Sequence, residues 1–198
     1  MSQIKLKHSG GNSVIIAAPS SNPASDRTIT LPSDADGTMA RTLDVSFKSY
    51  AIIADQKSNT TTGGVFSSGD WRTRDLNTEL TDPDGIVSIS SNQFTLQAGS
   101  YLIEADAPAH NINRHQIKLY QTSGTPADIA FGTGEFGSLS YAGTTRSFLK
   151  TRVTISSATT YEIRHRCQSV ASTSSGFGVA MSFGNVELYT VVKILKEV

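Results

Sequence analysis

Cysteine is almost absent from this sequence, which has one thiol, Cys167, among 198 residues. A lone cysteine cannot form a disulfide within its own chain, so the stability of the fold must come from core packing or from association between chains. We expect Cys167 to be a buried structural thiol, and a reactive thiol is the alternative.

Charge is also scarce. Only 17% of the residues are charged, and the 17 Lys and Arg balance the 17 Asp and Glu. A neutral chain has no electrostatic reason to bind nucleic acid or an anionic membrane. No apolar run approaches the ~20 residues of a membrane-spanning helix, and the first residues, Met-Ser-Gln-Ile-Lys-Leu-Lys, lack the apolar core of a signal peptide. We therefore expect synthesis in a cytoplasm, without membrane insertion.

The patterns that usually mark an enzyme or a metalloprotein are missing. The sequence contains no G-x-S-x-G, no phosphate-binding glycine loop and no Cys-x-x-Cys. None of the four histidines, His8, His110, His115 and His165, has the acidic partners of a zinc motif. We predict no catalytic residue, no metal ion and no cofactor. Glycosidase carboxylates remain the alternative, because the fold alone sets their spacing.

Two pairs of acidic residues lie close together in the sequence. Asp82 and Asp84 belong to Asp-Pro-Asp-Gly, which is a strong tight-turn signal. Calcium binding is the alternative, but calcium takes about six to eight oxygen ligands and this string is far shorter than an EF-hand loop. Glu104 and Asp106 would share one face of a strand. We interpret the first pair as a turn and assign no metal to either.

Residues with a hydroxyl group are abundant, with 27 Ser and 22 Thr. The chain also contains 16 Gly. Ser and Thr compete with helical hydrogen bonds, so this composition favours short strands joined by polar turns. Nine segments have the composition or alternation of strands: Tyr50–Ala54, Trp71–Leu76, Ile86–Ser90, Gln93–Leu96, Tyr101–Ala107, Gln116–Gln121, Arg146–Ile155, Tyr161–Gln168 and Val186–Leu195. This spacing predicts an all-β protein in which residues 45–198 form a jelly-roll β-sandwich. The alternation places His165 and Cys167 on an inward face.

Residues 1–44 differ from the rest, because their apolar segments are short and interrupted by Gly-Gly and by three of the six prolines. So little apolar surface cannot hold a lone segment together. We predict a thin intertwined β stalk in which copies from several chains share one core, and disorder is the alternative. The residues expected at this interface are Ile4, Leu6, Val14, Ile16, Ile29 and Leu31.

The last predicted strand is apolar on both faces. Val186, Leu188, Val192 and Ile194 alternate on one face, while Tyr189 and Val191 lie on the other. A strand of this kind is covered on both sides. We predict that Tyr189 and Val191 face a neighbouring subunit of a homotrimer, and a loop of the same chain is the alternative cover.

Two polar loops, Gly132–Thr145 and Ala171–Phe177, combine Gly and Ser with aromatic residues. An adaptable backbone with aromatic anchors is typical of recognition surfaces. We therefore predict receptor contacts by Phe136, Tyr141 and Phe177. The alternative is that these rings cap the core or line a subunit interface. Trp71, in a predicted strand, is expected in the core.

The segment Asn92-Gln-Phe-Thr-Leu-Gln-Ala-Gly-Ser-Tyr101 resembles the strand-turn-strand of tumour-necrosis-factor-like and complement-type globular heads. The alternation of Tyr101, Ile103 and Ala105 fits the strand that follows in that family. The resemblance covers about residues 48–198 and implies a trimeric head whose final strand lies near the threefold axis. The Ala-His-Asn-Ile-Asn segment after Pro108 and the lack of a calcium cluster depart from the pattern.

The N-terminal segment from Ile4 to Thr38, which begins Ile-Lys-Leu-Lys-His-Ser-Gly-Gly-Asn-Ser-Val-Ile-Ile, resembles a segment of tail fibres and related structural proteins of bacteriophages, notably cyanophages. The resemblance implies a virion protein that is made in the host cytoplasm and attaches to other virion proteins through residues 1–44. Together with the aromatic loops, it leads us to predict that the distal head binds a host-surface polysaccharide. The alternative is an architectural protein, such as a capsid decoration, neck or baseplate fibre, that binds only virion proteins.

Overall fold

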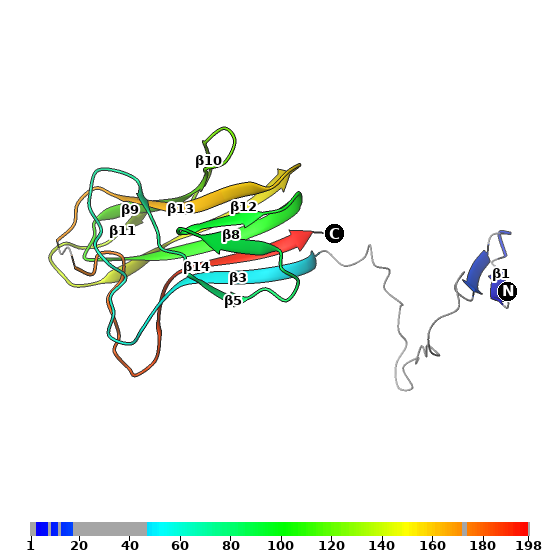
Figure 1. The fold of residues 1–198 in the computed structure, drawn as a ribbon, viewed down its shortest axis with the longest axis horizontal. Helices are drawn as coiled ribbons and strands as arrows, with labels where there is room; N and C mark the ends of the chain where they lie inside the picture. Colours follow the sequence, from blue (N-terminus) through cyan, green and yellow to red (C-terminus); the bar gives the residue numbers. More distant parts are fainter. Residues whose placement is uncertain (1–2, 8, 12, 18–46, 172–173, 198) are drawn as a thin grey trace. The chain divides into compact units, whose positions relative to one another are not determined.

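The computed structural model describes residues 3–7, 9–11, 13–17, 47–171 and 174–197. The chain divides into two compact units, Met1–Ala40 and Arg41–Val198 (Figure 1). The boundary predicted between residues 44 and 45 lies outside the described residues. All regular elements of the described residues are strands, which confirms the all-β prediction. The described part of the chain accordingly contains no helix that could span a membrane.

The first unit contains one antiparallel pair of strands, β1 (Gln3–Lys7) and β2 (Ser13–Ala17). Ile4 pairs with Ile16 and Leu6 with Val14. The turn between the strands includes Gly11, whose φ of 98° favours glycine. The side chains of both strands, together with Ile29 and Leu31, lie outside the described residues, so the intertwined stalk stays a prediction.

The second unit is a sandwich of two antiparallel sheets (Figure 1). The seven-stranded sheet has the order β10 (Ala127–Phe131), β9 (Arg114–Gln121), β13 (Thr159–Cys167), β7 (Gln93–Leu96), β6 (Val87–Ser90), with β11 (Glu135–Phe136) beside β9 and β4 (Arg72–Thr73) beside β13. The five-stranded sheet has the order β12 (Thr144–Ile155), β8 (Gly99–His110), β14 (Glu187–Glu197), β3 (Phe47–Lys57), β5 (Thr78–Thr81).

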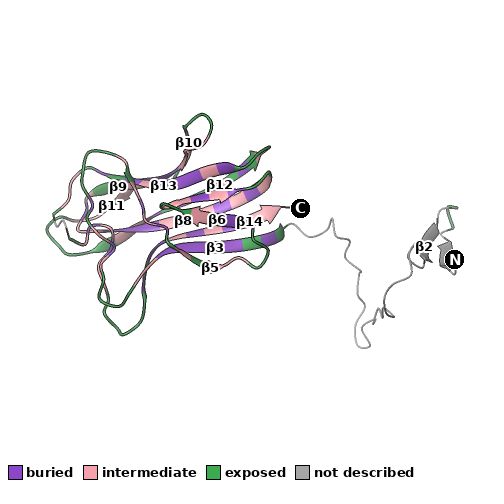
Figure 2. Cartoon of the chain, in the orientation of Figure 1, coloured by how far each residue is buried: buried purple, intermediate pink, exposed green. Residues whose placement is uncertain are grey.

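The main core lies between the two sheets, where the strands alternate buried and more exposed residues (Figure 2). In β8, Tyr101 and Ile103 are fully buried, as their alternation predicts. Phe94 of β7 pairs with Tyr161 of β13, and their rings lie 5.7 Å apart between centroids with planes tilted by 34°. Each large apolar side chain buried in this way contributes roughly 1.5–3 kcal/mol. The sandwich is therefore held by period-2 burial of its strands.

A smaller core cluster of Phe66, Ala109, Ile112 and Cys167 is extended by Val170 and Phe177. Cys167 is 2% exposed, and burial raises the pKa of its thiol to about 11. The thiol is thus a buried structural group, as predicted.

The chain enters and leaves the sandwich at the same end, because Phe47 pairs with Glu197. The long loops after β3, β11 and β13 gather at the opposite end, where residues 111–113 connect β8 to β9 (Figure 1). Asp82 forms the predicted turn, since its carboxylate accepts hydrogen bonds from the N–H groups of Ile86 and Val87, both at 2.9 Å. The sandwich thus has a base, where β3 begins and β14 ends, and a loop end opposite it.

Each of the nine predicted strands contains at least part of an observed strand, but β5, β10 and β11 were not expected. β5 and β10 are edge strands without a fully buried residue, and β10 has an irregular register between Asp128 and Ala130. β11 lies within a segment that we expected to be a loop. Strands that bury few apolar residues lack the alternation by which a strand is predicted from the sequence.

The face assignment predicted for the last strand is wrong at its start. The register of β14 against β3 shifts between Leu188 and Val191, so the alternation is interrupted there. Leu188 is 44% exposed, whereas Tyr189 is 3% exposed and donates a hydrogen bond to the Thr61 carbonyl at 2.7 Å. Tyr189 is therefore covered by a loop of its own chain and not left open for a neighbouring subunit.

Candidate binding groove

The three aromatic residues predicted to bind a receptor lie in different surroundings. Phe136, in β11, is 68% exposed, and Tyr141, in the following loop, is 81% exposed. Phe177 is partly buried, with its ring centroid 4.5 Å from that of Phe66. The structure therefore gives Phe177 a packing role and leaves Phe136 and Tyr141 on the surface. Of the three, only Phe136 lines the groove described next.

An open groove of about 700 Å³ lies beside the loop ends of β4, β9, β11 and β13. Its lining combines aromatic rings, two arginines, two amides and one carboxylate over a buried floor: Trp71, Phe136, Arg114, Arg166, Gln116, Gln168, Glu135, His115, Cys167, Gly69 and Gly134. Its polar groups surround apolar surface, which is the composition of a small-ligand site.

The alternation of two adjacent strands places these residues. Along β9 and β13, His115 and Cys167 point inward and pair with each other. Arg166 pairs with Gln116, and the Gln168 N–H donates to the Arg114 carbonyl at 2.9 Å. Residues two apart on a strand share a face. Arg114, Gln116, Arg166 and Gln168 therefore lie together on the outer face.

Trp71 forms an aromatic wall of the groove and is only partly buried, which corrects our expectation of a core position. The Lys118 ammonium lies 4.3 Å from the Trp71 ring centroid, and the Phe131 ring centroid lies 6.1 Å away. Lys118 in turn pairs with Asp128 at 2.5 Å. These contacts fix the orientation of the indole while leaving part of it accessible.

His115 lies in the floor of the groove and contacts a second buried histidine, His165, beneath it. Nδ1 of His115 lies 2.9 Å from Nε2 of His165, and Nε2 of His115 lies 2.7 Å from the Thr145 hydroxyl. Burial lowers the pKa of His115 to about 4 and lowers the pKa of His165 well below its ordinary value. Both imidazoles are thus neutral at pH 7, and the floor adds no charge to the groove.

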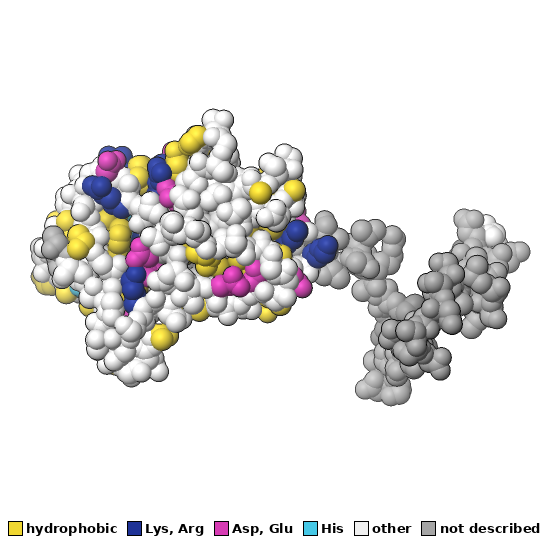
Figure 3. Space-filling model, in the orientation of Figure 1, with side chains coloured by type: hydrophobic (Ala, Val, Ile, Leu, Met, Phe, Trp, Pro, Cys, Tyr) yellow, Lys and Arg dark blue, Asp and Glu magenta, His cyan; other side chains and the backbone are white. Residues whose placement is uncertain are grey.

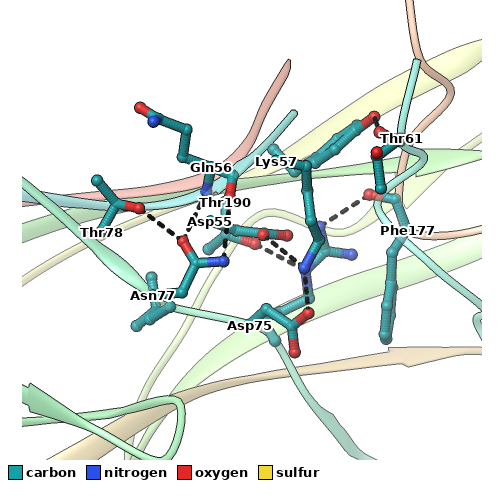
Figure 4. Close-up of polar contacts among 12 residues, drawn as sticks. Asp55, Gln56, Lys57, Thr61, Asp75, Asn77, Thr78, Phe177 and Thr190 are labelled. Atoms are coloured by element: carbon teal, nitrogen blue, oxygen red, sulfur yellow. Dashed lines mark hydrogen bonds and ion pairs between the residues drawn. The ribbon is translucent and has the colours of Figure 1, made fainter. Parts of the chain in front are cut away.

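A buried polar network holds the loops behind the groove. The Arg74 guanidinium donates hydrogen bonds to the Thr190 hydroxyl at 2.7 Å and to the Phe177 carbonyl at 2.8 Å. Beside it, Lys57 lies between Asp55 and Asp75, at 3.0 and 2.5 Å (Figure 4). Burial raises the pKa of Asp55, and Lys57 opposes this. The network links β3, β14 and the 174–178 loop.

A second surface covers the outer face of the five-stranded sheet. Phe148 is 52% exposed there, and Val191 is partly exposed beside it, each paired with Asp106 of β8. In the adjacent row Glu104 pairs with Lys150 at 3.0 Å and with Lys193 at 2.9 Å. A hollow of about 350 Å³ lies over these residues. This face therefore carries exposed apolar side chains beside ion-paired ones.

Acidic side chains do not gather into a metal site in the described part of the chain, where no group of three His, Cys, Asp or Glu could hold an ion. On the visible face of the head, hydrophobic and charged side chains lie in small separate groups (Figure 3). The groove is thus a local concentration of aromatic and cationic side chains on a surface of low charge.

Comparisons with known proteins give the class of the fold. No protein-family model and no curated protein matches the chain. Among solved structures, murine APRIL is similar over 75% of this chain and 98% of its own, with a TM-score of 0.50 and 8% identity. The globular domain of zebrafish complement 1qA protein matches 74% of this chain and 95% of its own, at 18% identity and a TM-score of 0.46.

Eiger TNF from S. frugiperda matches 78% of this chain and 94% of its own, at 10% identity and a TM-score of 0.47. The fold likeness to APRIL, together with the two-sheet architecture, confirms the predicted jelly-roll head. At such low identity the likeness defines the fold alone.

Proposed function

We propose that this chain is a non-enzymatic, homotrimeric fibre protein of a bacteriophage virion, whose jelly-roll head recognises a glycan on the host surface. The observation that carries the recognition role is the groove lined by Trp71, Phe136, Arg114 and Arg166 at the loop end. The base, where Phe47 enters the head, lies at the other end of the sandwich (Figure 1).

The trimer is supported by the outer face of the five-stranded sheet. Phe148 and Val191 give it exposed apolar side chains, and Glu104 pairs there with both Lys150 and Lys193. An interface core that is apolar, with paired charges, is typical of association between copies. The groove lies on the opposite sheet. Assembly through the five-stranded sheet would therefore leave all three grooves accessible.

Binding of the fluorescently labelled full chain to a panel of cyanobacterial strains tests this function. We expect at least one strain to be stained, and mild periodate oxidation of its surface sugars to abolish the staining. Trp71→Ala should weaken staining about tenfold or more, since large aromatic anchors dominate such contacts. Phe183→Ala is the matched control, because Phe183 is 82% exposed and does not line the groove.

The architectural alternative has a different outcome. If the labelled chain binds to none of the strains but binds purified virion proteins, the recognition role is contradicted. That result would support an architectural protein of the virion. Staining that survives periodate oxidation would contradict a glycan receptor.

A further inference from the structure

The two arginines of the groove carry charge that the described part of the chain does not neutralise. The side chains of Arg114 and Arg166 are exposed and make no ion pair or hydrogen bond with any described residue. Their neighbours differ in this respect, since Arg164 pairs with Glu162 and Lys118 with Asp128. An arginine kept unpaired beside paired cations is available to a ligand.

The positions of the two guanidinium groups suit one anion. Arg166 pairs with Gln116, which follows Arg114 by two residues, so the two arginines are diagonal neighbours on one sheet face. Such neighbours lie about 7–8 Å apart, which long side chains can bridge. Guanidinium groups bind carboxylate and sulfate in bidentate geometry. The groove contains one carboxylate, Glu135, whose oxygen accepts a hydrogen bond from Thr133 at 2.7 Å.

The remaining lining suits a sugar ring. Trp71 is held by Lys118 with part of its indole exposed, and Phe136 is 68% exposed at the other wall. The apolar C–H face of a sugar packs against such rings. Gln116 and Gln168 supply amide donors and acceptors for hydroxyl groups, although Gln116 already donates to the Gly132 carbonyl at 2.8 Å.

We propose that this groove binds an anionic saccharide, with its carboxylate or sulfate between Arg114 and Arg166 and its ring against Trp71. This inference rests on the proposed glycan recognition and names the class of glycan. The net charge of the lining supports it, because two arginines face one glutamate over a neutral histidine floor. A neutral glycan would leave both guanidinium groups without a partner.

A glycan array carrying uronic-acid, sialylated, sulfated and neutral oligosaccharides tests the inference with the full chain. We expect the bound members to carry a carboxylate or a sulfate. For an array member with a carboxylate, methyl esterification should weaken binding about tenfold or more, as should Arg114→Ala and Arg166→Ala, because charge-assisted hydrogen bonds are lost. Arg114→Lys should keep part of the affinity, and Phe183→Ala should keep all of it.

The two levels of the proposal fail in different ways. Binding of neutral oligosaccharides with unchanged affinity in Arg114→Ala and Arg166→Ala would overturn the anionic ligand and leave glycan recognition standing. Absence of binding to every saccharide and to every cyanobacterial strain would overturn both. Circular dichroism of each variant shows whether a loss of binding reflects a loss of folding.

Discussion

The guanidinium of Arg74 lies 4.1 Å from the ring centroid of Phe177 and also donates a hydrogen bond to the Phe177 carbonyl. Arg74 comes from the segment after β4, and Phe177 comes from a loop about a hundred residues further on. Arg74 is completely buried, and burial lowers its pKa to about 9. One side chain thus attaches the 174–178 loop to the sandwich.

Removing the Arg74 side chain should destabilise the head. We expect Arg74→Met to lower the free energy of unfolding by about 3–5 kcal/mol, because the buried Asp55 loses a compensating charge. Urea denaturation measures the difference. The exposed Arg72→Met is the matched control and should change stability by less than about 0.5 kcal/mol. Equal stability of the two variants would contradict the role of Arg74.

The buried histidines His115 and His165 make the free energy of unfolding depend on pH. His115 stays neutral in the folded chain down to about pH 4, whereas the unfolded chain protonates near its ordinary value of 6.5. The unfolded state therefore binds more protons in this window, and stability falls as pH falls through it. Each buried histidine should contribute up to about 1.4 kcal/mol per pH unit. Urea denaturation at several pH values measures this for the natural chain and for the double variant His115→Gln/His165→Gln. As pH falls, the free energy of unfolding should decline more steeply in the natural chain. Parallel curves would contradict the buried, neutral state of the two histidines.

Gly178 cannot accept a side chain. Its φ is 144°, and a Cβ atom there would lie 2.2 Å from Cδ1 of Tyr189. We expect Gly178→Ala to lower the free energy of unfolding by roughly 2 kcal/mol or more, because the backbone would be strained at this φ and the Cβ atom would displace the Tyr189 ring. Gly143→Ala is the control, since its nearest neighbour would be 3.8 Å away. Thermal unfolding compares the two variants, and Gly178→Ala should unfold at the lower temperature. Equal unfolding temperatures would contradict the packing of residues 177–178 over Tyr189.

One charged substitution on the outer face of the five-stranded sheet tests the proposed subunit interface. Phe148→Glu places a carboxylate beside Asp106 on the outer face of the five-stranded sheet, so burial against another copy becomes costly. We expect the variant to dissociate at micromolar concentration in analytical ultracentrifugation. Phe131→Glu is the matched control, because Phe131 is similarly exposed, at 54%, on the other sheet. An associated Phe148→Glu protein would exclude this face as the interface.

Much of the fold could be predicted because alternation reports burial directly. Tyr101, Ile103 and Cys167 point inward as their spacing indicates. The register shift between Leu188 and Val191 could not be predicted, because nothing in the local pattern marks the extra residue, and it reversed the face of Tyr189. Alternation is therefore reliable only within an unbroken ladder.

The groove was only partly predictable. Phe136 could be found from its Gly-rich loop. The segments that contain Trp71, Arg114 and Arg166 carry no binding motif in the sequence. They meet because β4, β9 and β13 are neighbours in the sheet, which is a long-range pairing. The one available signal was Trp71 itself, since an aromatic residue between Asp70 and Arg72 at a strand start suits a half-exposed position.

The mass of the intact chain in solution tests the central claim most directly. Multi-angle light scattering at micromolar concentration should give three times the 21.1 kDa mass of one chain. A mass of 21.1 kDa would contradict the homotrimeric fibre and the shared face of the five-stranded sheet.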